Sequence, residues 1–114
     1  MNSITLVGRL TADPELRTTH SGAAVTQMRV AVPRRRGKQG EDRGAVFCDV
    51  VTFGALAENC AQYLEQGRQV AVSGRLELDE WETDAGERRS RHKVVAEEIE
   101  FLGGRRSDDD EPGS

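Results

Sequence analysis

The hydrophobic residues of this chain recur at every second position over most of its length and follow the helical period in one short segment. In residues 4–10, the apolar side chains of Ile4, Leu6 and Leu10 share one parity. Side chains two positions apart lie on the same face of a strand, so this alternation predicts a half-buried β-strand. The same pattern predicts four further strands, over residues 24–33, 45–53, 69–81 and 89–101.

The change of period marks one segment as a helix. Apolar and small side chains recur there three or four positions apart, which predicts a helix over residues 55–64 with one buried stripe. Gly67, just beyond this segment, fits the left-handed residue that closes a helix. The predicted stripe consists of Leu56, Ala57, Cys60, Ala61 and Leu64.

Glycine, proline and charged residues separate these elements. Asp13-Pro14 and Ser21-Gly22 indicate a loop between the first two strands. Residues 34–44 (RRRGKQGEDRG) contain no apolar side chain and predict a mobile, solvated loop. Residues 83–86 (TDAG) predict the turn of a hairpin. Gly8 falls on the apolar parity of the first strand and predicts a bend or a bulge there.

The order of three strands, one helix and two strands is the layout of the oligonucleotide-binding (OB) barrel. We therefore predict an all-β fold, a five-stranded OB-fold barrel with one helix between strands 3 and 4. An open α+β sheet built from the same elements is the alternative. The 114 residues suit one domain. We place this domain at residues 1–103, followed by a short disordered acidic tail at residues 104–114.

The net charge of −4 is concentrated near the end of the chain. Four of the 20 acidic residues lie within the last eight positions, so the remaining 16 equal the 16 Lys and Arg residues. Binding to an anion depends on a local patch of charge, so a neutral body is compatible with a nucleic-acid partner. The four acidic residues are Asp108, Asp109, Asp110 and Glu111.

Three of the five aromatic residues fall on the polar parity of their strands. In the third predicted strand the more apolar parity starts at Val46, which places Phe47 and Phe53 outside, beside Asp49. Trp81 likewise falls opposite the Val and Leu row of the fourth strand. Exposed rings on strands can stack on bases of any type. The alternative is that these rings fill a subunit interface or a second small core.

The other large apolar side chains are expected to pack inside the domain. Tyr63 and Phe101 are the two remaining aromatic residues, and we assign both to packing. The inward row of the fourth strand is predicted to be Val70, Val72, Leu76 and Leu78.

Basic residues flank the exposed rings in two clusters. One cluster precedes the third strand and the other follows the hairpin turn, while Arg75 shares the parity of Trp81. Phosphates require positive charge along a track, which two basic loops could supply. Either loop taken alone could be merely solvated. The candidate DNA-binding bases are Arg34, Arg35, Arg36, Lys38, Arg43, Arg75, Arg88, Arg89 and Arg91.

The sequence offers no reactive set, so we predict a binding module that is not an enzyme. His20 and His92 belong to no catalytic arrangement, and we expect neither a cofactor nor a metal ion. Cys48 and Cys60 lack the spacing of a zinc site and are expected to be inert, reduced thiols, with a disulfide as the alternative. No apolar run is long enough to span a membrane, which predicts a cytoplasmic protein.

Several segments resemble the bacterial single-stranded DNA-binding proteins. Residues 1–10 (MNSITLVGRL) and 13–17 (DPELR) resemble the opening of that family, and residues 47–58 (FCDVVTFGALAE) resemble its most characteristic stretch. Residues 63–67 (YLEQG) and 72–76 (VSGRL) continue the similarity, which extends in order and spacing over residues 1–103.

The resemblance implies sequence-independent binding and protection of single-stranded DNA during replication, recombination or repair, at the nucleoid. By position it implies that Phe47, Phe53 and Trp81 stack on bases, with Phe47 standing where many members have tryptophan. A further tryptophan usual before the third strand is absent. Arg34 to Arg36 occupy that region, which suggests greater reliance on charge. The resemblance also implies a homotetramer.

The tail departs from the family pattern. Family members typically end in a linker and an acidic tip with a hydrophobic Pro-Phe that docks replication and repair proteins, whereas residues 107–114 (SDDDEPGS) lack the aromatic residue. We therefore expect weak or absent recruitment of those proteins. Two other functions remain open. One is a dimeric primosome-type replication-restart protein of related fold, and the other is an OB protein-interaction module.

Overall fold

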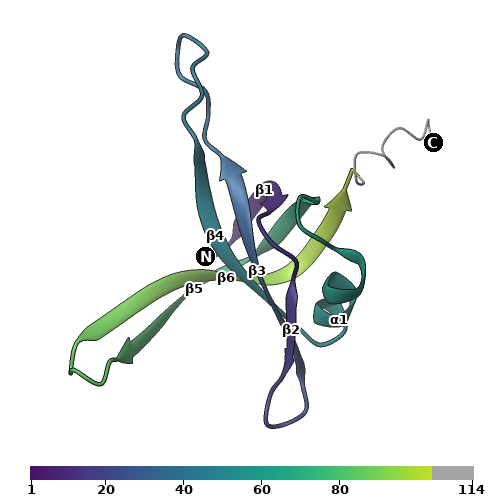
Figure 1. Ribbon diagram of the computed structural model, residues 1–114, viewed down its shortest axis with the longest axis vertical. Helices are drawn as coiled ribbons and strands as arrows, with labels where there is room; N and C mark the ends of the chain where they lie inside the picture. Colours follow the sequence, from purple (N-terminus) through teal and green to yellow (C-terminus); the bar gives the residue numbers. More distant parts are fainter. Residues whose placement is uncertain (104–114) are drawn as a thin grey trace.

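The computed structural model describes residues 1–103 and contains six strands and one helix (Figure 1). The predicted acidic tail lies outside the described residues. Among the described residues no helix is long and apolar enough to cross a membrane. The elements are β1 (Ile4–Leu10), β2 (Glu15–Thr18), β3 (Ala24–Pro33), β4 (Ala45–Phe53), α1 (Gly54–Tyr63), β5 (Gln69–Glu82) and β6 (Arg88–Leu102).

Five of the strands close into a ring in the order β1-β5-β6-β4-β3, which returns to β1. All neighbours pair antiparallel except β4 and β6, which are parallel and share two residue pairs, Val50 with Val94 and Val51 with Val95. The second short junction joins β3 to β1 at Arg9 and Leu10. Helix α1 follows β4, the third strand of the ring, as predicted. A closed ring with this helix confirms the OB fold and excludes the open α+β sheet.

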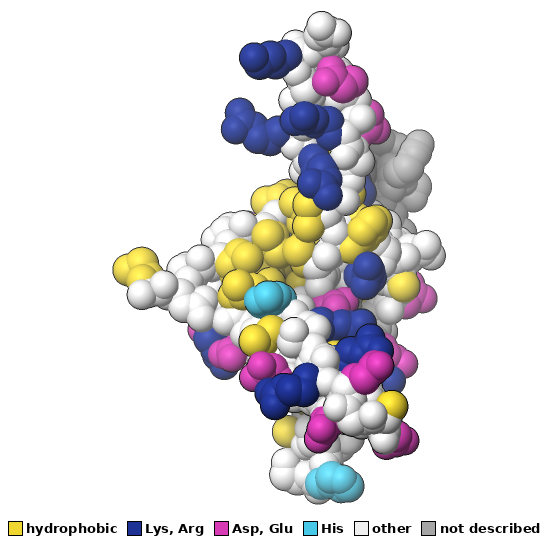
Figure 2. Space-filling view, turned by 90° about the vertical axis from the view of Figure 1, so that its left-hand side faces the viewer, with side chains coloured by type: hydrophobic (Ala, Val, Ile, Leu, Met, Phe, Trp, Pro, Cys, Tyr) yellow, Lys and Arg dark blue, Asp and Glu magenta, His cyan; other side chains and the backbone are white. Residues whose placement is uncertain are grey.

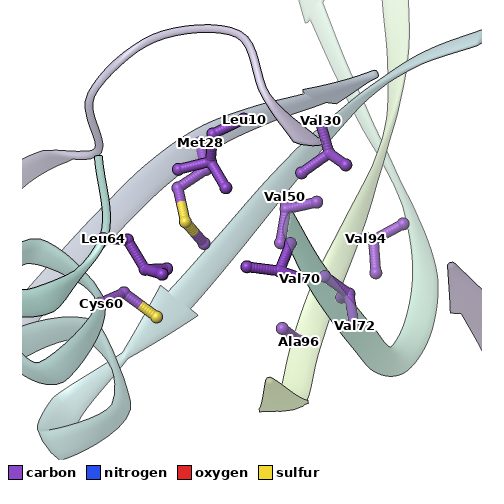
Figure 3. Packing of buried hydrophobic residues seen from close by; sticks show 10 residues of the cluster. All are labelled: Leu10, Met28, Val30, Val50, Cys60, Leu64, Val70, Val72, Val94 and Ala96. Atoms are coloured by element: carbon purple, nitrogen blue, oxygen red, sulfur yellow. The ribbon is translucent and has the colours of Figure 1, made fainter. Parts of the chain in front are cut away.

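The core fills the inside of the ring (Figure 3). Alternate residues of β3 and β4 point inward, as their parity predicted, and two of them are threonines. Thr26 Oγ1 donates a hydrogen bond of 2.8 Å to the Ala57 carbonyl, which ties the sheet to α1. Thr52 Oγ1 donates one of 3.5 Å to the Thr26 carbonyl. The buried apolar cluster is Leu10, Met28, Val30, Val50, Cys60, Leu64, Val70, Val72, Val94 and Ala96.

Two glycines permit close approach between strands. A Cβ at Gly8 would collide with the carbonyl oxygen of Ala31, at the point where β1 passes from β5 to β3. A Cβ at Gly74 would collide with the carbonyl oxygen of Val95. The described strands show their bulge between Ser73 and Gly74, and not at Gly8. The first strand therefore requires glycine at position 8 because there is no room for a side chain beside the backbone of β3.

Two local predictions require correction. The segment between the first two predicted strands is not only a loop, because Glu15–Thr18 pairs antiparallel with β3 as a sixth strand outside the ring. The helix ends at Tyr63, one residue earlier than predicted, and Leu64 is extended. Gly67 has the expected left-handed conformation, with φ of +89°, but it lies in a turn that Arg68 N–H closes on the Glu65 carbonyl.

Four side chains assigned to the interior are exposed, and one of them is Val46 of β4, which is 41% exposed. Leu76 and Leu78 have the predicted inward parity, yet they are 42% and 45% exposed. The β5–β6 hairpin extends past the ring at these positions, so no strand covers them (Figure 1). Tyr63, at the end of α1, is 57% exposed, whereas Phe101 packs partly buried against the core as predicted.

The predicted thiol character of the cysteines agrees with their placement. Cys48 and Cys60 are both free. Burial raises the pKa of the Cys60 thiol to about 11. Burial, followed by the charge of Asp49, also raises the pKa of Cys48. A raised pKa keeps both thiols protonated at neutral pH, which makes them poor nucleophiles.

Candidate nucleic-acid interface

The candidate interface is the side of β3, β4, β5 and β6 that points away from the core. Residues paired across neighbouring antiparallel strands share a face, so the register defines this surface. Phe47, which pairs with Ala31, lies on it, and Trp81, which pairs with Arg89, lies on its extension along the hairpin. We call it the outer face, and its central residues are Gln27, Arg29, Phe47, Asp49, Val51, Phe53, Arg75, Glu77, Asp79, Trp81, Arg89, Arg91, Lys93 and Val95.

The structure places all three predicted stacking rings on the outer face. Phe47, Phe53 and Trp81 are 53%, 50% and 48% exposed. Phe47 and Phe53 lie at opposite ends of β4, six residues apart, which corresponds to about 20 Å of strand. Trp81 lies near the end of the β5–β6 hairpin. The rings are therefore spread along a surface. This arrangement suits an extended polymer as a ligand better than a single small molecule.

Val51 belongs to the same row as the two phenylalanines but is buried. It pairs with Val95 where β4 and β6 meet, and these two side chains cover the outside of that junction. Beside the junction the strands diverge and leave a hollow of about 130 Å³. Polar and charged side chains line most of it, including Gln27, Asp49, Asp79, Arg91 and Lys93.

The first predicted basic cluster projects beyond the ring as an arm between β3 and β4, which we define as residues 34–44 (Figure 1). These residues belong to neither strand and are almost all exposed, as the predicted solvated loop requires, and backbone hydrogen bonds join the two sides of the arm. Arg34 N–H donates to the Gly44 carbonyl, and Gly37 N–H to that of Glu41. Figure 2 shows Lys and Arg side chains along this basic arm, above a cluster of hydrophobic side chains.

The basic arm carries uncompensated charge. Its five bases and two acids give a net charge of +3, since 5 − 2 = 3. None of the five bases forms an ion pair with another residue of the described chain. Arg36 donates to the Gly40 carbonyl, which leaves its charge available. These five bases are Arg34, Arg35, Arg36, Lys38 and Arg43.

The bases of the β5–β6 hairpin divide between its two faces. Arg89 and Arg91 lie on the outer face with Trp81, since Arg89 pairs with Trp81 and Arg91 with Asp79. Arg88 pairs with Glu82 and lies on the opposite face, so the structure does not bring this predicted contact to the rings. Arg75 lies on the outer face as predicted.

The outer-face bases, unlike those of the basic arm, are held by carboxylates. Arg75 Nε lies 2.7 Å from Glu77 Oε2, and this hydrogen bond raises the pKa of the Arg75 guanidinium. Arg89 pairs with Glu87 at 2.6 Å, and Lys93 Nζ lies 3.0 Å from Asp79 Oδ2. The bases of the outer face thus have carboxylate partners, whereas those of the basic arm form no ion pair within the described part of the chain.

The sequence matches a known group of proteins. A family model described as the single-strand binding protein family matches residues 1–102. The chain belongs to that family. The region that matches the single-strand binding protein family contains both the outer face and the basic arm.

Individual family members show similarity over most of the chain. A single-stranded DNA-binding protein of Wolinella succinogenes is 42% identical over 103 residues, 89% of this chain and 64% of the relative. One of Clostridium tetani is 44% identical over 103 residues, 90% of this chain and 70% of the relative. Single-stranded DNA-binding protein A of Bacillus subtilis is 43% identical over 102 residues, 90% of this chain and 59% of the relative. The matched region thus spans between 59% and 70% of these relatives.

The structure adds one residue that the sequence did not identify as part of the site. The guanidinium of Arg29 lies over the Phe47 ring, 5.2 Å from its centroid. Its outward parity on β3 was readable from the sequence. Its neighbours were not, because they depend on the register that pairs Arg29 with Asp49.

No metal centre accompanies these residues. Within residues 1–103, no group of three or more His, Cys, Asp and Glu side chains could hold a metal ion. The outer face and the basic arm offer rings, hydrogen-bonding groups and positive charge, which are the elements of a nucleic-acid binding surface.

Proposed function

We propose that this chain binds single-stranded DNA without reading its sequence and protects it during replication, recombination or repair. The observation that carries this proposal is the set of three half-exposed rings, Phe47, Phe53 and Trp81, on one face beside a positive arm. Membership of the single-strand binding protein family supports it. We place its action at the nucleoid, in the cytoplasm.

Base stacking provides the sequence-independent part of the binding. Every base has a flat π-face, and each base stacked on an aromatic ring contributes about 1–3 kcal/mol. About half of the surface of each of Phe47, Phe53 and Trp81 is buried, so their rings would lose less conformational freedom on binding DNA than fully exposed side chains. The DNA strand would run along β4 and out over the β5–β6 hairpin.

Charge provides the second part of the binding. Arg34, Arg35, Arg36, Lys38 and Arg43 on the basic arm would contact phosphates, with the outer-face bases Arg75, Arg89 and Arg91 contributing less because carboxylates hold them. Arg88 lies on the opposite face and would contact only a strand that wraps around the hairpin. Binding of this kind requires no chemical step, so we propose a protein that is not an enzyme.

Titration with oligo-dT tests the proposed function and the role of Trp81 together. The fluorescence of Trp81, the single tryptophan, is expected to be quenched by oligo-dT and not by a duplex of equal length. Trp81→Ala is expected to cost about 1–3 kcal/mol of binding free energy, measured by anisotropy of a labelled oligonucleotide. This corresponds to a loss of about fivefold to 150-fold in affinity.

Tyr63→Ala is the matched control. Tyr63 is as exposed as the three rings but lies at the end of α1, away from the outer face. Its removal is expected to leave the affinity unchanged. Equal losses for both variants would contradict a specific role of Trp81. If oligo-dT neither bound nor quenched, the protein-interaction module would become the leading function.

We further propose that the chain assembles as a homotetramer. Val46, Leu76 and Leu78 are 41%, 42% and 45% exposed although strand parity directs them inward, and apolar surface of this kind is typical of subunit contacts. Sedimentation at micromolar concentration is expected to give the mass of four chains, and Leu76→Glu a smaller species. A monomeric wild type would contradict the assembly, and a dimer would favour the primosome-type alternative.

The weak recruitment of replication and repair proteins remains a prediction from the resemblance. It concerns residues 104–114, which lie outside the described residues. A pull-down of a tail-binding partner, at the strength shown by a family member with the Pro-Phe tip, would contradict it.

A further inference from the structure

Asp49 occupies the centre of the outer face and contacts two bases from different strands. Its Oδ1 lies 3.5 Å from Arg29 Nη1 on β3, and its Oδ2 lies 3.5 Å from Arg91 Nε on β6. The side chain of Asp49 is 32% exposed, whereas those of Arg29 and Arg91 are 53% and 65% exposed. One carboxylate is thus shared by two cations that are open to the solvent.

Both cations lie where a bound strand would pass. Arg29 covers the ring of Phe47, so a base that stacks on the same side of this ring meets the guanidinium. Arg91 lines the hollow beside the β4–β6 junction, together with Asp49 and Asp79. Phe47 and the hollow are parts of the outer face, so the two arginines cannot be remote from DNA bound there.

A phosphate and a carboxylate compete for the same guanidinium. Arginine binds either anion through the same fork of N–H donors, and each cation shared with a carboxylate is a weaker phosphate site. At the other end of the surface, the bases of the basic arm face no such competitor among the described residues. Figure 2 shows few acidic side chains along the arm, and acidic and basic side chains mixed over the lower part of the molecule.

We propose that Asp49 competes with the phosphates of the bound strand for Arg29 and Arg91, and thereby limits both the affinity of the outer face and its dependence on salt. This role rests on the proposed function and adds a regulating residue to it. In this proposal the outer face binds mainly through stacking and the basic arm mainly through charge, because Asp49 occupies Arg29 and Arg91.

Asp49→Asn tests this role, because asparagine preserves the shape and removes the charge. Binding of oligo-dT at about 0.1 M salt is expected to become tighter by about fivefold for each arginine released. The slope of log K against log salt is expected to steepen by up to about 1.4, since each phosphate neutralised on a single strand contributes about 0.7. Asp49→Glu, which restores the carboxylate, is expected to return the slope toward that of the wild type.

Glu58→Gln is the matched control, with the same change in net charge. Glu58 is exposed on α1, outside the outer face. Its slope is expected to equal that of the wild type. An unchanged slope in Asp49→Asn, or an equal gain in Glu58→Gln, would overturn the role of Asp49. Weaker binding of Asp49→Asn at an unchanged slope would also overturn it. Absence of wild-type binding would instead refute the proposed function.

Discussion

Replacement of Arg34, Arg35 and Arg36 by glutamine is expected to weaken the binding of oligo-dT about a hundredfold at about 0.1 M salt. The three arginines lie on the basic arm and form no ion pair with other described residues, so their loss removes phosphate contacts directly. Three contacts at about 0.7 each would reduce the slope of log K against log salt by about 2. Anisotropy titrations at several salt concentrations measure both quantities.

High salt supplies the internal control for this triple variant. At about 1 M salt the counterion contribution disappears, so wild type and variant are expected to bind with similar affinity through stacking alone. The thermal unfolding midpoint is expected to be unchanged, because the arm contains no apolar residue that packs in the core. If the hundredfold loss of affinity persisted at high salt, the arm would act by positioning the aromatic rings and not by its charge.

Gly8→Ala is expected to lower the free energy of unfolding by about 3 kcal/mol, at the upper end of the cost of overpacking. The added Cβ collides with the Ala31 carbonyl oxygen, which belongs to the backbone of β3 and cannot rotate away. The two strands would have to separate at the short β1–β3 junction. Thermal unfolding is expected to shift down by about 10–20 °C for a domain of this size.

Gly22→Ala separates this collision from the general cost of replacing glycine. Gly22 has φ of +90° and nothing within 4 Å of the position of a Cβ, so its replacement costs only the left-handed conformation, about 1–2 kcal/mol. Gly8 is not one of the described glycines with positive φ, so its replacement carries no such conformational cost. Equal destabilisation of the two variants would show that Ala31 yields readily to a side chain at position 8.

The alternation of side chains predicted the ring and its core because each central strand has one buried face. Thr26, Met28 and Val30 follow the predicted parity and are buried. β2 escaped detection because all four of its residues are exposed, so its sequence carries no alternation of burial. This strand forms through backbone hydrogen bonds to β3, and such bonds do not depend on which side chains the strand carries.

The parity of a residue in a strand predicts the face on which its side chain lies, but not how deeply that side chain is buried. Leu76 and Leu78 point to the predicted side, yet they are exposed because the hairpin is longer than the ring that it helps to form. Conversely, Val51 shares the parity of Phe47 and Phe53 and lies on the outer face, but it is buried beside Val95. Both outcomes depend on where strands end and meet, which is a property of the tertiary structure.

The candidate site was predictable as far as single residues are concerned. The exposed positions of Phe47, Phe53 and Trp81 followed from the pattern within each strand. The pairing of Arg29 and Arg91 with one carboxylate did not, because it joins three strands that are remote in sequence. Only the register between strands reveals that Arg29 and Arg91 of the outer face share a carboxylate.

The two-pair junction between β4 and β6 has a consequence for the order of folding. The long β5–β6 and β3–β4 pairings join neighbouring segments, whereas the β4–β6 junction brings together Val50 and Val94, which lie 44 positions apart. Closing such a distance costs chain entropy before any contact rewards it, so we expect hairpins first and ring closure late. Asp49 meets Arg91 only across that junction. A chain still emerging from the ribosome would therefore have its basic arm before it has the finished outer face.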